Sequence, residues 1–261
     1  DNKSITFKDT VEHYKFFLKN HGISHNLIEN EITVERIKDW NLSNKIPGIL
    51  EWLKNCQLNC GMEISEIPLN QLHSWGDIKN GHSIGHESND FFEIIGVRIK
   101  TSKTREVASG WDQPFVKQVD LKGGILGLLR KKIADIPHYL VEAKAEPGNP
   151  NLVQLSPTLQ ATFSNIRQSH GGAKPLFSDF FEGHLDTRIG SDLLFKQWLP
   201  EDGGRLYLKS NLGMVINAPL DFDIDISKYE TFRWVTLHDI LYMIKNTNWV
   251  NPHIRSLVCA L

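Results

Sequence analysis

Short segments rich in β-branched and aromatic residues follow one another from Met62 onward, and this pattern favours a fold built around a β-sheet. The segments expected to form strands are Met62–Pro68, Phe91–Lys100, Phe115–Val119, Ile125–Lys132, Tyr139–Ala145, Leu152–Ser156, Arg205–Lys209, Met214–Ala218 and Phe232–Thr236. Turn residues separate them, as in 79–81, 122–124 and 146–149. We therefore expect a mixed sheet at the centre of the fold.

Helical spacing of apolar residues marks both ends of the chain. The region from Thr6 to Leu53 repeats apolar residues every three or four positions, and a helix is expected after Thr236, where Asp239 favours the first turn. The predicted fold class is thus α+β, with an N-terminal helical region over residues 1–61 and one module over residues 62–261. The helical region is expected either to cover the core of its own chain or to pack against another subunit.

Composition limits the classes of function. With 261 residues, 40% of them hydrophobic, the chain can bury one substantial core or two small ones. A formal charge of -2 does not support general attraction to nucleic acids or membrane surfaces, but it is compatible with a phosphate-bearing small ligand. The absence of an apolar run of eighteen residues and of a signal-like N-terminus leads us to expect a cytoplasmic protein.

The cysteines do not indicate a disulfide framework. Cys56, Cys60 and Cys259 are odd in number, which favours reduced thiols. Cys56 and Cys60 have the spacing of half a metal site, but no second Cys/His pair follows at a suitable distance. We therefore expect no metal.

The stretch from Glu142 to Gly172 is unusually dense in hydroxyl, amide and turn residues. Five polar residues fall at even intervals and would project from one face of an extended chain: Gln154, Ser156, Thr158, Gln160 and Thr162. Such a face is either a solvent-exposed strand edge or the lining of a ligand cleft. The spacing alone does not decide between these interpretations.

Four strings in and near this stretch resemble the NDP-hexose 2,3-dehydratase family. They are WDQP (111–114), EAKAEPGNPNLVQLSPTLQAT (142–162), SN (164–165) and HGG (170–172). Weaker similarity extends through LHSW, FFEIIGVRI, RLYLKSNLGMVI, FRWVTLHDI and NPHIRSL, so that nearly all of the chain after Met62 is covered.

The resemblance implies a fold and an assembly. Members of that family resemble Nudix hydrolases in fold and usually carry two such modules in tandem, whereas one is present in this sequence. We therefore expect a homodimer to replace the tandem pair. The glutamate-rich Nudix signature is absent, which disfavours pyrophosphate hydrolysis.

The resemblance also implies a lyase reaction in deoxysugar biosynthesis. In a nucleotide-linked 4-keto-6-deoxyhexose, the hydrogen on C3 is α to the ketone, so that a base can remove it if the C4 enolate is stabilised. The C2 hydroxyl then leaves, and the resulting enol becomes a 3,4-diketo-2,6-dideoxy sugar. This chemistry needs no hydride acceptor and no obligatory metal, so no cofactor is expected, and the sequence contains neither GxGxxG at a strand-helix junction nor a P-loop.

Three titratable residues of the matched region are candidates for acid/base work. Glu142 lies on an apolar strand, after Tyr139, Leu140 and Val141, where burial would raise its pKa toward the working range. His170 precedes two glycines and can approach a substrate closely, or it is a surface turn residue. Glu146 precedes Pro147 and is either catalytic or a turn residue.

A larger set is expected to bind the substrate, with an aromatic residue stacking on the base and cations or hydroxyls meeting the diphosphate. The members are Trp75, Lys144, Gln154, Ser156, Thr158, Gln160, Thr162, Ser164, Asn165, Arg167, Gly171, Gly172, Lys209 and Asn211. Trp75 has a core position as its alternative. Phe163 stands where the family pattern leads us to expect an arginine, so phosphate is expected to bind another cation, Arg167 or Lys144, or the ligand differs from the usual dTDP sugar.

Two other functions are compatible with these residues. The single module and Phe163 also fit a noncatalytic sugar-nucleotide-binding protein that partners another deoxysugar enzyme. An isomerase or epimerase would share the deprotonation at C3 without expelling the hydroxyl.

Overall fold

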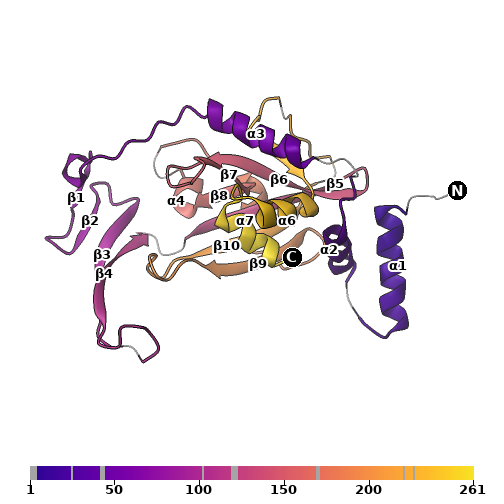
Figure 1. Cartoon of the computed structure of the whole chain (residues 1–261), viewed down its shortest axis with the longest axis horizontal. Helices are drawn as coiled ribbons and strands as arrows, with labels where there is room; N and C mark the ends of the chain where they lie inside the picture. Colours follow the sequence, from indigo (N-terminus) through magenta and orange to yellow (C-terminus); the bar gives the residue numbers. More distant parts are fainter. Residues whose placement is uncertain are drawn as a thin grey trace.

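A seven-stranded sheet lies at the centre of the molecule, with helices on both faces (Figure 1). A separate four-stranded sheet extends from one end, and the first two helices lie at the opposite end. The computed structural model describes residues 5–24, 26–41, 45–101, 103–118, 123–168, 171–219, 221–225 and 227–261.

Helices begin the chain and end it, as expected from apolar spacing. Those of the first part are α1 (Phe7–Asn20), α2 (Leu27–Ile37) and α3 (Ile46–Asn59). The later ones are α4 (Phe163–Ile166), α5 (Ser178–Glu182), α6 (Leu237–Asn246) and α7 (Pro252–Cys259), and a short 3-10 turn, η1, covers Leu69–Gln71. The predicted start of α6 is confirmed, because Thr236 and Asp239 form a capping box around its first turn.

The four-stranded sheet is an antiparallel meander. Its strands are β1 (Trp75–Asp77), β2 (Ser83–His86), β3 (Phe92–Ile99) and β4 (Trp111–Gln118), hydrogen-bonded in that order. The long β3–β4 ladder pairs Phe92 with Gln118 and Ile99 with Trp111.

The central sheet has the order β11-β6-β5-β10-β9, with β7 paired to β6 and β8 paired to β5. Its strands are β5 (Gly124–Ile133), β6 (Ile136–Ala145), β7 (Val153–Pro157), β8 (Leu159–Thr162), β9 (Leu193–Pro200), β10 (Ser210–Asn217) and β11 (Phe232–Val235). Only the β5–β10 pairing is parallel among the described strands. The α+β prediction is confirmed, and the resemblance to the Nudix fold stays a prediction.

β5 and β6 form a fork in this sheet. They pair from the hairpin as far as Leu129 and Leu140, and then separate. β7 continues the ladder of β6 and β8 continues that of β5, so Thr158, between them, lies at the branch point. Its hydroxyl accepts a hydrogen bond from the N–H of Leu129 at 2.9 Å and donates one to the carbonyl of Leu140. A buried side chain thus replaces the ladder bonds that the two strands lose on separating.

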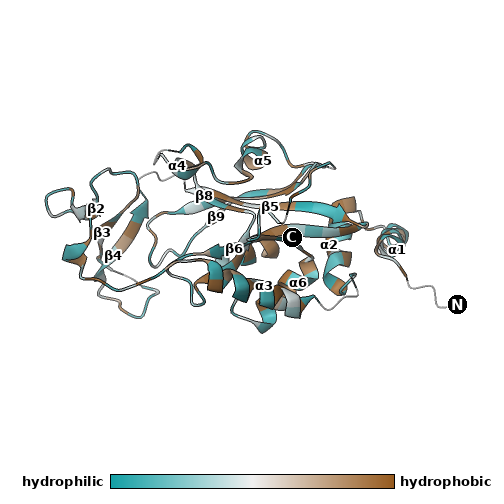
Figure 2. Cartoon of the chain, turned by 90° about the horizontal axis from the view of Figure 1, so that it is seen from above, coloured by the Kyte–Doolittle hydropathy of each residue, from teal (hydrophilic) through white to brown (hydrophobic). Residues whose placement is uncertain are grey.

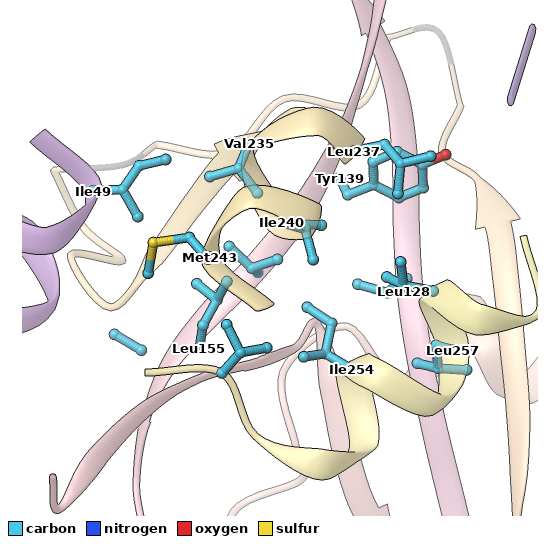
Figure 3. Packing of buried hydrophobic residues seen from close by; sticks show 14 of the residues in the cluster. Ile49, Leu128, Tyr139, Leu155, Val235, Leu237, Ile240, Met243, Ile254 and Leu257 are labelled. Atoms are coloured by element: carbon cyan, nitrogen blue, oxygen red, sulfur yellow. The ribbon is translucent and has the colours of Figure 1, made fainter. Parts of the chain in front are cut away.

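Two hydrophobic cores cover the two faces of the central sheet. α3, α6 and α7 lie on one face, where Leu128, Tyr139 and Leu155 of the strands meet Ile240 and Ile254 of the helices (Figure 3). On the other face, α4 and α5 lie over a core that includes Leu129, Leu140, Phe181 and Met214 (Figure 2). A sheet covered on both faces explains why β5 is apolar from Gly124 to Leu129.

A buried ionic cluster fastens α2 to the central sheet. Arg130 of β5 donates to Glu31 at 2.8 Å and to Glu35 at 2.7 Å, and the Tyr139 hydroxyl donates to Glu35 at 2.9 Å. Burial raises the pKa of Glu35, against the opposing effect of Arg130. This cluster crosses the predicted boundary at residues 61 and 62, and the division into two parts stays a prediction.

Two predicted strands are absent from the structure. Met62–Pro68 is extended but pairs with no described strand, and Ile64 and Ile67 are exposed because no second layer covers them. Arg205–Lys209 forms only a single bridge, between Leu206 and Val116, because Asp202 starts a tight turn and Leu208 has a φ of 52°. The strands β1, β2, β8 and β9 were not predicted; the first three are short, and β9 has eight residues.

The cysteines form no disulfide among the described residues, and the helices there are not of the membrane-spanning kind. Cys56 and Cys60 are free thiols whose sulfurs point to the backbone carbonyls of Glu230 and Gln57. Within the described ranges, no helix combines the length and the apolar character that crossing a bilayer would need.

Thr158→Val is expected to lower the free energy of unfolding by about 1–3 kcal/mol, because it leaves the buried N–H of Leu129 without its acceptor. Thr158→Ser keeps the hydroxyl and serves as the matched control, with a clearly smaller loss. Urea unfolding of the two variants measures the difference. An equal loss in both would show that the methyl group, and not the hydroxyl, matters at the fork.

Candidate active site

A pocket of about 230 Å³ lies between the four-stranded sheet and the central module. One wall is formed by Phe91, Phe92, Val116 and Gln118, from β3, β4 and the turn before β3. The facing wall consists of the β8–α4 junction and the segment before β10, and its residues are Thr162, Ser164, Asn165, Leu206 and Lys209. Pockets for complete small-molecule ligands measure roughly 300–1,000 Å³, so this pocket fits part of a larger ligand.

Aromatic side chains gather on the sheet side of the pocket. Phe91 and Phe92 are 40% and 42% exposed, so both rings present part of their surface beside the pocket. Trp75 supports them from β1, with its ring centre 4.8 Å from that of Phe92 and 6.3 Å from that of Phe91. This wall offers flat faces against which an aromatic ligand can stack.

Glu93 holds the strands that carry this wall. Its side chain is 2% exposed and pairs with Lys79 at 2.6 Å and with Lys117, its cross-strand neighbour, at 3.0 Å. The hydrogen bond from Lys79, together with that from Lys117, lowers the pKa of Glu93 to about 2. The three charges fix the β1–β2 turn, β3 and β4 relative to one another.

A short backbone bridge joins the two walls. The N–H of Val116 donates to the carbonyl of Arg205 at 2.9 Å, and the N–H of Tyr207 donates back to Val116 at 2.8 Å. The side-chain amide of Gln113 adds a bond to the carbonyl of Gly204 at 2.8 Å. Leu206 and Lys209 are therefore held beside β4.

The facing wall gathers four of the predicted binding residues. Thr162 caps α4 by accepting from the N–H of Asn165 at 3.2 Å, and its hydroxyl lies 2.9 Å from that of Ser164. Lys209 contributes a cation, and no carboxylate in the described ranges pairs with it. Hydroxyls, an amide and an ammonium group on one wall suit a phosphate or a sugar.

The predicted carboxylates form a second group, the carboxylate cluster, made of Glu142, Lys144, Glu146 and Gln160. Lys144 lies 3.4 Å from Glu142, and the amide of Gln160 donates to Glu146 at 2.8 Å. Burial raises the pKa of Glu142, Lys144 opposes this, and the charge of Glu146 adds to the rise. Gln160 and Thr162 lie two residues apart on β8, so this cluster borders the pocket wall without lining the pocket.

Three predicted binding residues are buried in internal hydrogen bonds. Gln154 donates to the carbonyl of Asn248 at 3.0 Å, Ser156 accepts from Asn251 at 2.7 Å, and Thr158 occupies the fork. Ser156 and Gln160 lie on either side of the fork but meet at one group, because the side-chain amide of Asn251 donates to Ser156 and also to Gln160 at 2.9 Å. Ser156 is opposite Glu142 on β6, and Gln160 is opposite Leu126 on β5. Their predicted contact with a ligand stays a prediction.

The remaining candidates lie away from the pocket. Arg167, Gly171 and Gly172 are exposed beyond α4, and Asn211 is buried and donates to Glu201. His170 falls outside the described residues. Phe163, the first residue of α4, packs against the core that α4 and α5 cover. The guanidinium of Arg167 lies 6.0 Å from the centre of the Phe163 ring. Among the described residues, Lys209 lines the pocket, whereas Arg167 and Lys144 do not.

Sequence reasoning missed the other wall of the pocket. Phe91 and Phe92 are adjacent, and neighbouring strand residues point to opposite faces, so one of two consecutive rings had to lie outside a core. That signal was available. Gln118 gave none, because its place in the pocket depends on how the two sheets meet. Among the described residues, no three His, Cys, Asp or Glu side chains gather as a metal site requires.

Comparison with known proteins gives one family model and three relatives that share the same name. The model of one protein family, described as NDP-hexose 2,3-dehydratase, matches residues 47–261. A dTDP-4-dehydro-6-deoxy-alpha-D-glucopyranose 2,3-dehydratase from Saccharopolyspora spinosa is 33% identical over 210 residues, which cover 80% of this chain and 41% of that protein. Proteins of the same name from Amycolatopsis orientalis and Streptomyces violaceoruber are 33% and 31% identical, each over 76% of this chain and over 41% and 42% of their own lengths. The chain thus spans about two fifths of the length of these relatives.

Glu93→Gln is expected to lower the melting temperature by about 2–8 °C near pH 6, because it removes the charge that Lys79 and Lys117 share. The pKa of Glu93 is depressed from 4.5 to about 2, so this stabilisation is complete above pH 4.5 and disappears as the pH falls toward 2. Thermal unfolding of both proteins over this range measures it. A difference in melting temperature that stays constant down to pH 2 would contradict this role.

Proposed function

The chain belongs to the NDP-hexose 2,3-dehydratase family, and on this premise we propose that it eliminates water across C2 and C3 of an NDP-4-keto-6-deoxyhexose. The match over residues 47–261 carries the proposal, because it spans both walls of the pocket and the carboxylate cluster. The relatives named above act on a dTDP sugar, so dTDP is the proposed nucleotide. The product is a 3,4-diketo-2,6-dideoxy sugar nucleotide.

The pocket is the proposed site of the nucleotide. Its aromatic wall suits a base, and Lys209 with the hydroxyls of the facing wall suits the diphosphate. Because the pocket fits only part of a nucleotide sugar, the hexose extends beyond it. The bond between Gln160 and Glu146 connects the Thr162 wall to the carboxylates, which supports placing the sugar toward that cluster.

Glu142 is the proposed base. An ionised Glu142 removes the proton from C3, and the electron pair moves onto the C4 oxygen as an enolate. Lys144, 3.4 Å from Glu142, provides a positive charge that stabilises this enolate. As the enolate collapses, the C2 hydroxyl leaves as water with a proton from Glu146 or His170, and the C2–C3 enol then takes up a proton at C2 to become the C3 ketone.

The elimination is tested by incubating the 261-residue chain with freshly made dTDP-4-keto-6-deoxyglucose and trapping the product with a reductase. A 2-deoxy sugar nucleotide is the expected result. Binding without turnover would favour the noncatalytic module, for which Phe163 in place of an arginine is the supporting observation. Solvent deuterium at C3 without loss of oxygen would instead indicate an isomerase or epimerase.

Glu142→Gln is expected to lower kcat by about 10² to 10⁴-fold while leaving substrate affinity nearly unchanged, since proton transfer is lost and binding groups remain. Steady-state kinetics and calorimetry measure the two effects. Glu51→Gln, at an exposed position of α3, is the matched control. Turnover at the wild-type rate in the Glu142 variant would remove this residue from the mechanism.

The rate is also expected to depend on pH through Glu142. A base must be ionised, and burial raises the pKa of Glu142, so kcat/KM should increase with pH through an apparent pKa above the ordinary value of 4.5. The pH profile of kcat/KM measures it. An acidic limb at or below 4.5 would contradict this assignment.

The expected homodimer and the expected cytoplasmic location stay predictions. Light scattering of the purified chain tests the first. Twice the mass of one chain is the expected result, and a fully active monomer would contradict it.

A further inference from the structure

Gln118 presents a buried carbonyl oxygen that lacks a hydrogen-bond partner. It is the last residue of β4 and lines the pocket between the two sheets. Its Oε1 atom is fully buried, and no group in the described ranges donates to it. A buried acceptor without a donor is unfavourable, so an orphan of this kind at a pocket indicates a donor that arrives with a ligand.

The surroundings of Gln118 suit a flat heterocycle. Phe92 is directly opposite Gln118 in the β3–β4 ladder, so both side chains lie on the same face. The ring of Phe92 is 42% exposed and is supported from behind by Trp75. A planar ligand stacked on Phe92 would thus present its edge to the Gln118 carbonyl.

The charged residues of the pocket indicate which end of the ligand lies at which wall. Asp90 lies with Phe91 and Phe92 on the sheet side, and its carboxylate would repel phosphate but can accept from a ribose hydroxyl. Lys209 lies on the facing wall with Ser164 and would attract phosphate. Base and ribose therefore belong to the sheet side, and the diphosphate to the facing wall.

We propose that Gln118 recognises the nucleobase, with Oε1 accepting a hydrogen bond from the ring N–H of a 2,4-dioxopyrimidine such as thymine or uracil. This inference rests on the proposed function, because it takes a nucleotide sugar as the ligand. The ring N–H of such a base lies between two carbonyls and is a strong donor. Cytosine has an acceptor at the same ring position, so the carbonyl of Gln118 opposes it.

The test is calorimetric binding of dTDP and dCDP, which share the deoxyribose and the diphosphate, to the 261-residue chain and to Gln118→Met. The wild type is expected to prefer dTDP, and the variant to bind dTDP about tenfold more weakly, with similar affinity for the two nucleotides. Gln118→Leu, which also lacks the acceptor, should behave alike. Gln197→Met changes an exposed glutamine of β9 in the same way and should alter neither affinity.

Thermal unfolding without ligand separates recognition from a structural role. Because the Gln118 carbonyl has no donor within the described chain, Gln118→Met should melt at the wild-type temperature or above it. A marked drop in melting temperature would overturn the inference. So would unchanged dTDP affinity and unchanged preference in both variants.

Two outcomes distinguish this inference from the proposed function. If the variants bind dTDP as the wild type does while the wild type still converts the 4-keto sugar, only recognition by Gln118 is refuted. If the wild type binds neither nucleotide, the inference and the nucleotide-binding role of the pocket are both refuted.

Discussion

The two hydrogen bonds of the Thr158 hydroxyl are the interaction on which the arrangement of the central sheet depends. β5 and β6 begin as an ordinary hairpin, and two further strands must enter between them without leaving backbone groups unpaired. A hydroxyl at the branch point meets this need, because it can accept from one strand and donate to the other. An apolar side chain of the same shape would do neither.

The fork also determines where the polar residues of the 142–172 stretch go. Before Thr158, Ser156 accepts from Asn251, which caps α7, so this part fastens the C-terminal helices to the sheet. After it, β8 leads Gln160 to Glu146 and Thr162 to the pocket. Asn251 also donates to Gln160 at 2.9 Å, so the two parts of this run stay joined, and Thr162 is the one of the five evenly spaced residues that lines the pocket. The facing wall is completed only where β4 pairs with the segment that leads to Lys209.

Patterns in the sequence predicted those elements that depend on residues close together along the chain. The apolar and β-branched runs of β3, β5, β6 and β10 and the capping box of α6 were visible in the sequence, because each depends on neighbours along the chain. Met62–Pro68 has the composition of a strand and lacks a partner, which no local pattern reveals. In the site, the resemblance led to Thr162, Ser164, Asn165 and Lys209. The adjacent rings Phe91 and Phe92 carried a signal that one of them lies outside a core, but Gln118 carried none, because it joins the pocket only through the contact between two sheets.

The central claim is that the pocket between the two sheets holds the nucleotide. A crystal structure of the chain with bound dTDP tests it most directly. The account predicts the base against Phe92 with an edge toward Gln118, and the diphosphate beside Lys209. A nucleotide bound elsewhere, with this pocket filled only by water, would contradict it.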